Sequence, residues 1–383
     1  MLTYGMPPDH SGAAKQAITL ASTLSVQGVR IFFISQGSSR EALAVKRVAN
    51  FEVFRIYKQS LIWKVIAPAR FFWLLFTKRC EFSILHVHGF GYLGKIAVVF
   101  GKMFRKPVII KMTMVGEDDA MSIRQGPRGW LAFRLFSTAS HYIAITETFR
   151  KSCEAAGLPV SKVSLIPNGV DIARFCPVSE PERQALRTRL GIPADKIVLA
   201  YAGLVRPEKG IDFLLDAASK LHGQHSSAML VLMGPVEPWL PAEERRYADR
   251  MLERIKGELR GIVQFVGNVS NVHEFFQASD IFVSASHREG FPNVLLEAMA
   301  TGLPPVVIEI PGVHAGILRD GTDGVVVPQR DVQAFVRELE RLVDQPERRR
   351  AIGAAARRKA KEHYSVDRVT TDYLHLYREL VHG

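Results

Sequence analysis

The sequence predicts an α/β fold with two parallel sheets, and three observations support this class. Short runs of β-branched and other apolar residues alternate with helical segments along the whole chain. This alternation is typical of parallel sheets that carry helices on both faces. The length of 383 residues allows two domains with separate cores. Residues 168–182 combine Asn-Gly, prolines and charged side chains, and this composition predicts an exposed linker between the domains.

The first half of the chain begins with an unusually short strand candidate. Only the stretch MLTYG precedes the Pro7-Pro8 break, so either the first strand is clipped or the true start of translation lies upstream of Met1. The further strands, which are rich in β-branched and aromatic residues, are expected at 29–35, 82–89, 106–112 and 141–146. Helical periodicity covers residues 11–25, 91–104 and 128–139.

The second half repeats the alternation with a different sequence. Strands are expected at 196–203, 228–234, 262–267, 280–286, 303–309 and 323–328. Helices are expected between them at 210–222, 241–257, 271–278, 293–301 and 331–344. The two halves are therefore predicted to be Rossmann-like domains rather than copies of one repeat.

The basic charge of the chain lies in its first half. The formal net charge is +12; residues 1–175 hold 23 Lys and Arg against 10 Asp and Glu, and the remainder holds 27 against 28. The first half is therefore expected to meet an anionic partner. Nucleic acid is not expected, because no nucleic-acid-binding motif is present.

Residues 60–79 interleave aromatic and basic side chains, a composition that suits an anionic membrane surface. An ordinary core-facing helix with a basic edge, bent at Pro68, is the favoured alternative, because most such stripes pack inward. No apolar run reaches the ~18 residues that a spanning helix needs. The three cysteines are odd in number and widely spaced, which suits a reducing compartment. With no leader peptide recognised, a cytoplasmic location is expected, with peripheral attachment to the inner face of the membrane.

Residues 201–221, YAGLVRPEKGIDFLLDAASKL, contain the first candidate binding motif. Here Arg206 and Lys209 lie between a buried strand and the start of a helix. Two cations beside exposed backbone amides and the positive end of a helix can hold a diphosphate. Solvated loop charges would give the same pattern, so the motif alone leaves both interpretations open.

Residues 287–304, HREGFPNVLLEAMATGLP, contain the second motif. Glu289 precedes a helix and Glu297 lies one turn inside it, so a bound nucleotide could meet both. A carboxylate can accept hydrogen bonds from two vicinal hydroxyl groups, which makes a ribose and a sugar ring sensible ligands. Alternatively, both carboxylates only complement the helix dipole.

These two motifs, together with VSLIPNGVDIARF at 163–175, resemble the family-4-type retaining glycosyltransferases, also described as glycosyl transferases group 1. The likeness extends over nearly the whole chain, with several motifs in the same order. It implies the GT-B fold, in which two Rossmann-like domains face each other across a cleft. Residues 1–172 would bind the acceptor, 173–364 the nucleotide sugar, and a helix at 365–383 would return to the first domain.

By this resemblance, Arg206 and Lys209 bind the donor diphosphate during catalysis, Glu289 holds the transferred sugar and Glu297 holds the ribose. Gly12 would face the diphosphate across the cleft. The backbone of the turn would line the phosphate and sugar pocket at Phe291, Pro292, Asn293 and Val294.

The chain departs from the family at two places. Thr113 stands about where a histidine is often found, and the segment 311–316 lacks a frequent glutamate. The resemblance implies that transfer can continue without the histidine, because the leaving phosphate can take the acceptor proton while cations stabilise it. His88, Asp118 and Asp119 join Thr113 as acceptor-side candidates.

No metal or other cofactor is expected. The histidines lack metal-ligand spacing, no Asp-x-Asp follows a strand, and Arg206 and Lys209 would replace a metal ion. The predicted reaction is retaining transfer from a nucleotide diphosphate sugar, with UDP as the first choice, to a glycan or lipid-linked acceptor at the membrane. A sugar-nucleotide epimerase and a non-catalytic subunit with the same fold remain alternatives, and the base, sugar and acceptor are left open.

Overall fold

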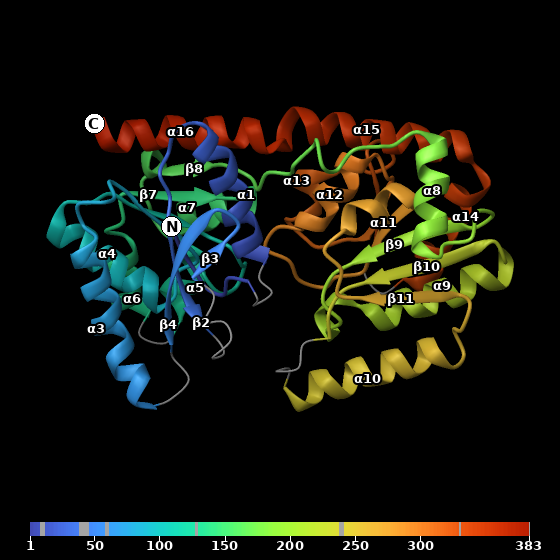
Figure 1. Cartoon of the computed structure of the whole chain (residues 1–383), viewed down its shortest axis with the longest axis horizontal. Helices are drawn as coiled ribbons and strands as arrows, with labels where there is room; N and C mark the ends of the chain where they lie inside the picture. Colours follow the sequence, from blue (N-terminus) through green and yellow to red (C-terminus); the bar gives the residue numbers. More distant parts are fainter. Residues whose placement is uncertain are drawn as a thin grey trace. The chain divides into compact units, whose positions relative to one another are not determined.

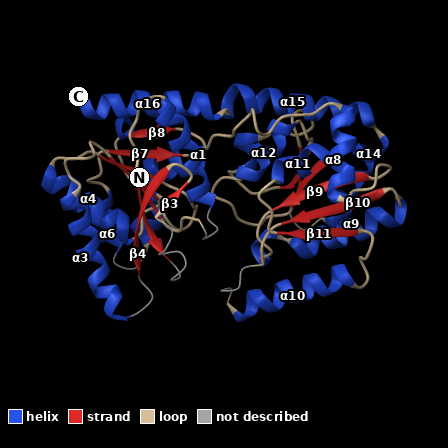
Figure 2. Ribbon diagram, in the orientation of Figure 1, coloured by secondary structure: helices blue, strands red, loops and turns tan. Residues whose placement is uncertain are grey.

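The computed structural model describes residues 1–7, 12–37, 46–57, 61–126, 129–236, 241–328 and 331–382. They form two compact units. Unit 1 comprises Met1–Gly169 and Val366–Gly383, and unit 2 comprises Val170–Ser365. Each unit contains one sheet flanked by helices, so the predicted α/β class with two parallel sheets is confirmed (Figures 1 and 2).

The sheet of unit 1 has the strand order β3-β4-β2-β1-β5-β6-β7-β8. Neighbouring strands are parallel except for β3 and β4, which are antiparallel. The strands are β1 (Leu2–Thr3), β2 (Phe33–Gly37), β3 (Arg47–Val48), β4 (Phe51–Tyr57), β5 (Leu85–His88), β6 (Val108–Lys111), β7 (His141–Ala144) and β8 (Val163–Leu165). The helices are α1 (Gly12–Val26), α3 (Leu61–Thr77), α4 (Tyr92–Phe104), α5 (Ala120–Gln125), α6 (Gly129–Phe136), α7 (Glu147–Ala155), η1 (Val160–Lys162) and α16 (Val366–His382).

Two strands of unit 1 begin later than the sequence predicts. The strand expected at 29–35 is β2, which begins at Phe33, and the strand expected at 82–89 is β5, which begins at Leu85. Both flank β1, which contributes only Leu2 and Thr3 to the ladder. On their other sides, β2 pairs with β4 from Phe33 and β5 pairs with β6 from Leu85, so both ladders begin at these residues. The β-propensity of the residues before them is therefore overridden by the register of the sheet.

The C-terminal helix α16 returns to unit 1, as the resemblance implied. It packs on α1, where the hydroxyl oxygens of Thr23 and Thr370 are 2.6 Å apart. It also covers β5, where Tyr377 Oη lies 2.7 Å from His86 Nδ1. Because Tyr373 on the same helix is completely buried, α16 is part of the core of this unit.

Helix α3 divides the aromatic and basic stripe at residues 60–79 between core and solvent. Phe71 and Leu75 are buried, and Phe72 contacts Phe100 of α4 edge to face with ring centroids 5.4 Å apart. In contrast, 65% of Trp73 is exposed. The favoured core-facing interpretation therefore holds for one side of this helix only.

Unit 2 has a fully parallel sheet with the order β11-β10-β9-β12-β13-β14. Its strands are β9 (Ile197–Ala202), β10 (Ala228–Met233), β11 (Val263–Gly267), β12 (Ile281–Ser284), β13 (Pro305–Ile308) and β14 (Val325–Val327). Its helices are α8 (Glu180–Leu190), η2 (Pro207–Lys209), α9 (Ile211–Gln224), α10 (Ala242–Lys256), α11 (Val272–Ala278), α12 (Asn293–Thr301), α13 (His314–Ile317), α14 (Val332–Asp344) and α15 (Pro346–Tyr364). β10 is buried at every residue, as expected for a strand that helices cover on both faces.

Candidate functional site

The candidate site in unit 2 forms where β9 and β12 end. These strands are neighbours in the sheet, so the loops that follow them meet at its carboxyl edge, where ligands of parallel α/β folds bind. The backbone amide of His287 donates a 2.8 Å hydrogen bond to the carbonyl of Glu208 and links the two loops. Gly210 allows a close approach, because a Cβ at this position would stand 2.2 Å from the carbonyl oxygen of Ala285.

Lys209 and Glu289 meet across these two loops. Lys209 Nζ lies 2.6 Å from Glu289 Oε1, and about a fifth of each side chain is exposed (18% and 19%). Sequence reasoning placed both residues at the ligand but did not foresee that they would contact each other. The ion pair holds the ammonium group at the edge of the sheet, where an anionic ligand would compete with Glu289 for it.

Arg206 is also placed among carboxylates. Its Nη1 lies 3.7 Å from Glu208 Oε1, and its Nε lies 3.4 Å from Glu244 Oε2 on α10. The contact with Glu244 was missed, since nothing in the sequence of α10 marks this residue. Both predicted phosphate-binding cations are therefore already paired with carboxylates. A bound diphosphate would add negative charge beside them and further favour their charged forms.

The turn before α12 presents the start of that helix at the same edge. The amide of Asn293 donates to the carbonyl of Phe291 at 3.0 Å, and the amide of Leu295 donates to the carbonyl of Pro292 at 3.0 Å. Phe291 is buried and contacts Tyr364 edge to face. Glu297 is half-buried in the first turns of the helix. This packing fixes the turn, and the helix N-terminus adds a positive dipole end to the site.

A histidine stabilises the segment 311–316, which lacks the glutamate that is frequent in the family. His314 is buried, and its Nδ1 accepts a 3.1 Å hydrogen bond from the amide of Ile310. Burial lowers the pKa of His314 to about 4, so this ring is neutral and structural at neutral pH.

In unit 1, Asp118 and Thr113 form one loop with internal hydrogen bonds. Asp118 accepts from the amides of Thr113 and Met114 and, at 2.7 Å, from the Thr113 hydroxyl. Burial raises the pKa of Asp118 to about 6. A Cβ on Gly89 would stand 3.2 Å from Asp118 Oδ2, so this loop borders the end of β5. The oxygens of Asp118 are engaged in shaping the loop.

Asp119, like Asp118, is held by hydrogen bonds from nearby backbone and side-chain groups. It is buried and accepts hydrogen bonds from the amides of Gly116 and Ser122 and from the Ser152 hydroxyl. These bonds hold the pKa of Asp119 below its usual value, although its burial acts in the opposite direction. Gly12, the remaining candidate of unit 1, is exposed at the first residue of α1; residues 8–11 before it lie outside the described part of the chain.

A buried basic cluster lies beside these loops. The rings of His86 and His88 stack with centroids 4.4 Å apart, and Lys111 is the ladder partner of His88 on β6. Neither ring nitrogen of His88 has a hydrogen-bond partner among the described residues. Burial, with Lys111 nearby, lowers the pKa of both histidines well below the usual value. Lys111 was not predicted, although a lysine at the end of the otherwise apolar strand KPVIIKM was a usable signal.

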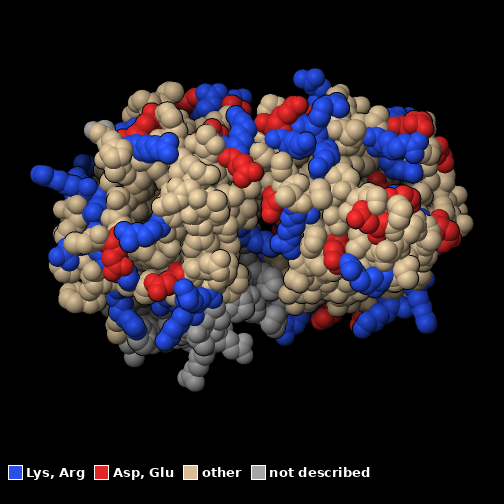
Figure 3. Space-filling view, turned by 45° about the horizontal axis from the view of Figure 1, so that its top comes forward, with Lys and Arg blue, Asp and Glu red and all other residues tan. Residues whose placement is uncertain are grey.

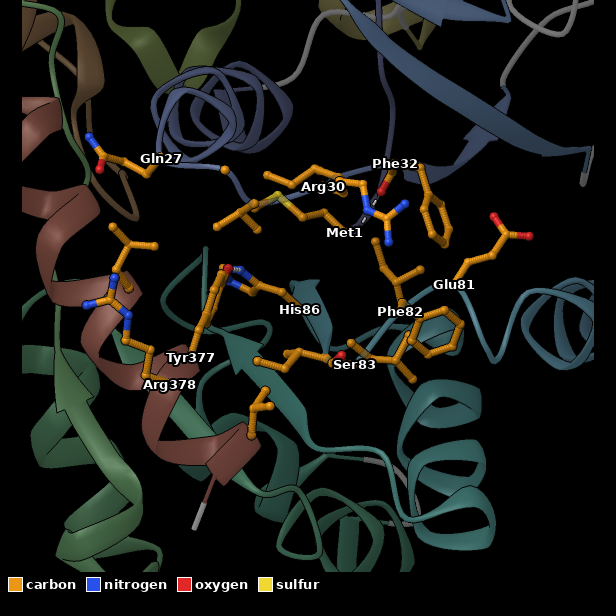
Figure 4. Close-up of a pocket in the computed structure, with 18 of the residues that line it drawn as sticks. Met1, Gln27, Arg30, Phe32, Glu81, Phe82, Ser83, His86, Tyr377 and Arg378 are labelled. Atoms are coloured by element: carbon orange, nitrogen blue, oxygen red, sulfur yellow. Dashed lines mark hydrogen bonds between the residues drawn. The ribbon is translucent and has the colours of Figure 1, made fainter.

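A separate cavity of about 390 Å³ lies at the opposite edge of the same sheet (Figure 4). Its walls include Phe32, Phe82 and Ser83 before β2 and β5, and Tyr377 of α16 beside His86. These are the amino ends of parallel strands, whereas nucleotides bind at the carboxyl ends. The cavity is therefore distinct from the candidate donor site. No group of three or more His, Cys, Asp and Glu side chains in the described ranges could hold a metal ion.

Comparison with known proteins decides the family. The pattern of the Glycosyl transferases group 1 matches residues 182–359, and that of Glycosyltransferase Family 4 matches residues 10–174. The chain belongs to glycosyltransferase family 4. It is a retaining glycosyltransferase that uses a nucleotide sugar, and the predictions of family, enzyme class and GT-B fold with two Rossmann-like sheets are confirmed.

Relatives of this family-4 protein include D-inositol 3-phosphate glycosyltransferases. That of Kineococcus radiotolerans is 25% identical over 386 residues, which span 92% of this chain and 87% of that protein. That of Saccharomonospora viridis is 33% identical over 222 residues, or 57% of this chain and 50% of that protein. The fold is similar to HepE of Anabaena in complex with UDP-glucose, with a TM-score of 0.78, 18% identity and 99% of each chain covered.

Proposed function

We propose that the protein transfers a sugar from a UDP-sugar to a glycan or lipid-linked acceptor with retention of anomeric configuration. The observation that carries this proposal is the meeting of Lys209, Glu289 and the α12 turn at the carboxyl edge of the unit 2 sheet. The Anabaena neighbour was solved with UDP-glucose, which supports UDP as the nucleotide.

The two cations would act on the leaving group. As the bond between the sugar C1 and the diphosphate oxygen breaks, negative charge grows on the diphosphate, and Arg206 and Lys209 would stabilise it. The acceptor oxygen forms the new bond to C1 from the same face, and its proton passes to an oxygen of the departing phosphate. This step needs no protein base, so Thr113 can replace a histidine without stopping transfer.

The two glutamates would have different tasks. Glu297 would accept hydrogen bonds from the vicinal hydroxyls of the ribose. Glu289 would position Lys209 through the 2.6 Å ion pair and offer its second oxygen to a hydroxyl of the sugar. Gly12 and the backbone of Phe291 to Val294 would contact the phosphates and the sugar.

The acceptor would bind unit 1, near His88, Thr113, Asp118 and Asp119. The basic surplus of residues 1–175 favours an acceptor that carries phosphate. The relatives named D-inositol 3-phosphate glycosyltransferase also support an acceptor that carries a phosphate group. An acceptor linked to a lipid phosphate at the inner membrane face would meet this requirement.

A thermal-shift screen of UDP-, GDP-, ADP- and dTDP-sugars tests the donor site. A ligand at about 100 times its Kd stabilises a protein by ~2.7 kcal/mol, which raises Tm by several degrees. We expect UDP-sugars to raise the Tm of the wild type and of Arg189→Ala, an exposed ion-pair control. Arg206→Ala and Glu297→Ala should abolish the shift, and EDTA should leave it unchanged.

If no nucleotide shifts the Tm, the non-catalytic alternative replaces the proposal. If both site variants keep the full shift, the donor binds elsewhere. Incubation with the donor alone separates transfer from epimerisation, because an epimerase converts its nucleotide sugar without an acceptor. NMR of the product anomer then tests retention.

A further inference from the structure

Exposed apolar side chains gather on three helices of unit 1. Ten large apolar side chains are exposed in the described part of the chain, and none of them lies in unit 2. Six belong to α3, α4 and α6: Ile66, Trp73, Val99, Met103, Trp130 and Leu131. The two tryptophans are 65% and 69% exposed. Exposed tryptophans are costly in water, so this gathering indicates a contact surface.

The three helices form one surface, which we call the docking face. α4 packs against both α3 and α6 (Figure 1). Between α4 and α6 runs a groove of about 490 Å³ whose walls include Val99, Met103 and Leu131 together with Lys102 and Arg134. The apolar and basic side chains of the docking face are therefore mixed rather than separated.

The charged side chains of the docking face are all basic. The sequences of α3, α4 and α6 contain no Asp or Glu and five cations: Lys64, Arg70, Lys95, Lys102 and Arg134. Lys95, Lys102 and Arg134 form no ion pair with any described residue. The guanidinium of Arg134 lies 4.9 Å from the ring centroid of Trp130. Such pairs of tryptophan and arginine suit the boundary between water and lipid headgroups.

We propose that the docking face binds an anionic lipid bilayer, with the tryptophans in the headgroup region and the cations on lipid phosphates. A second copy of the chain is a poor occupant, because a two-fold contact would bring Lys102 and Arg134 of both copies together. None of the described helices is long and apolar enough to cross a membrane, so attachment through this face would be peripheral.

This inference deepens the proposed function, since it names the surface that would bring unit 1 to a lipid-linked acceptor. It also revises the sequence interpretation. The predicted membrane segment at 60–79 contributes Trp73, but its Phe71 and Leu75 are core residues. The remaining contacts come from α4 and α6, which the aromatic pattern at 60–79 did not indicate.

Vesicle flotation with the full-length protein tests the docking face. We expect binding at low salt to vesicles of phosphatidylcholine with phosphatidylglycerol, and weak binding to phosphatidylcholine alone. The double variants Trp73→Ser with Trp130→Ser and Lys102→Glu with Arg134→Glu should each weaken binding at least about tenfold. The matched controls Val160→Ser and Lys151→Glu change exposed residues of unit 1 outside the docking face and should bind like the wild type.

Three outcomes would overturn the inference: no flotation with anionic vesicles, equal binding of the two double variants and the wild type, or binding to a soluble acidic polypeptide in place of vesicles. The UDP-sugar thermal shift is measured on the same variants and should stay unchanged, because the donor residues lie in unit 2. A lost thermal shift with intact flotation contradicts the donor assignment alone. Absence of wild-type flotation with an intact thermal shift contradicts only the docking face, whereas the two double variants are expected to lose flotation and keep the shift.

Discussion

At the residue scale, Gly210 determines how closely the two site loops approach each other. Its φ of +63° is left-handed, and an added Cβ would meet the Ala285 carbonyl oxygen at 2.2 Å. Gly191 has a similar φ of +67° but open space around the missing Cβ. Gly191→Ala should therefore lower the free energy of unfolding by only about 1 kcal/mol, the strain of an alanine in the left-handed region. Gly210→Ala should cost about 1–3 kcal/mol more, because the loops must move apart.

Urea unfolding of both variants measures this difference. Equal costs for the two substitutions would show that the loops after β9 and β12 are not held in contact. The UDP-sugar thermal shift should be weaker for Gly210→Ala than for Gly191→Ala, because Lys209 directly precedes the displaced residue.

Lys111 gives the second residue-scale prediction, a pH dependence of stability. Burial lowers the pKa of Lys111 from 10.5 to about 7, while the ammonium group lies 5.6 Å from the Tyr373 ring centroid. Between these two pKa values the unfolded chain binds the proton and the folded chain does not. Stability should therefore rise with pH across this window, by roughly 1.4 kcal/mol per pH unit for one group.

Replacing Lys111 with Met should remove that part of the slope and stabilise the protein at pH 7. Lys15→Met, on the exposed side of α1, is the control and should leave the slope unchanged. Unfolding free energies at several pH values from 7 to 10 measure both effects. A slope that survives in Lys111→Met would assign the dependence to another group, such as a tyrosine.

At the element scale, two hydrogen bonds that join α16 to the rest of unit 1 should differ in their contribution to stability. Tyr377→Phe removes the only hydrogen bond of the His86 ring among the described residues, and it leaves a buried acceptor or donor unpaired. We expect Tyr377→Phe to lower the free energy of unfolding by about 1–3 kcal/mol. Thr370→Val should cost less, because the Thr23 hydroxyl retains the Leu20 carbonyl as a partner at 3.0 Å. Denaturant unfolding ranks the two variants, and the opposite order would contradict this account.

Elements also show how far sequence reasoning reaches. Buried strands such as β10 and periodic helices such as α14 were predicted nearly to their ends, because hydrophobic pattern alone determines them. β2 and β5 were predicted to begin too early, because their first residues are set by the ladders with β4 and β6. In the site, the residue types were predictable, whereas the Lys209–Glu289 pair and the contact of Arg206 with Glu244 depend on loops whose approach no sequence pattern encodes.

At the scale of the whole molecule, the basic surplus and the proposed donor site belong to different units. On the face that Figure 3 shows, Lys and Arg are interspersed with Asp and Glu. The surplus of residues 1–175 therefore does not form a single basic patch on that face. Local sets of cations without acidic neighbours, such as those of the docking face, then decide where an anionic surface binds.

The two units should also differ in their ability to fold as separate fragments, which gives the last prediction. Unit 2 is continuous from Val170 to Ser365, and one hydrophobic cluster joins its strands to α9, α10 and α14. We expect residues 170–365 alone to unfold cooperatively and to keep a thermal shift with UDP-sugars. Residues 1–169 alone lack α16, whose Tyr373 and Leu376 are buried, and should show a broad transition. Circular dichroism melts of both fragments test this prediction. Cooperative unfolding of the 1–169 fragment would mean that α16 is dispensable for the fold of unit 1. A 170–365 fragment that shows no thermal shift with UDP-sugars would assign donor contacts to unit 1.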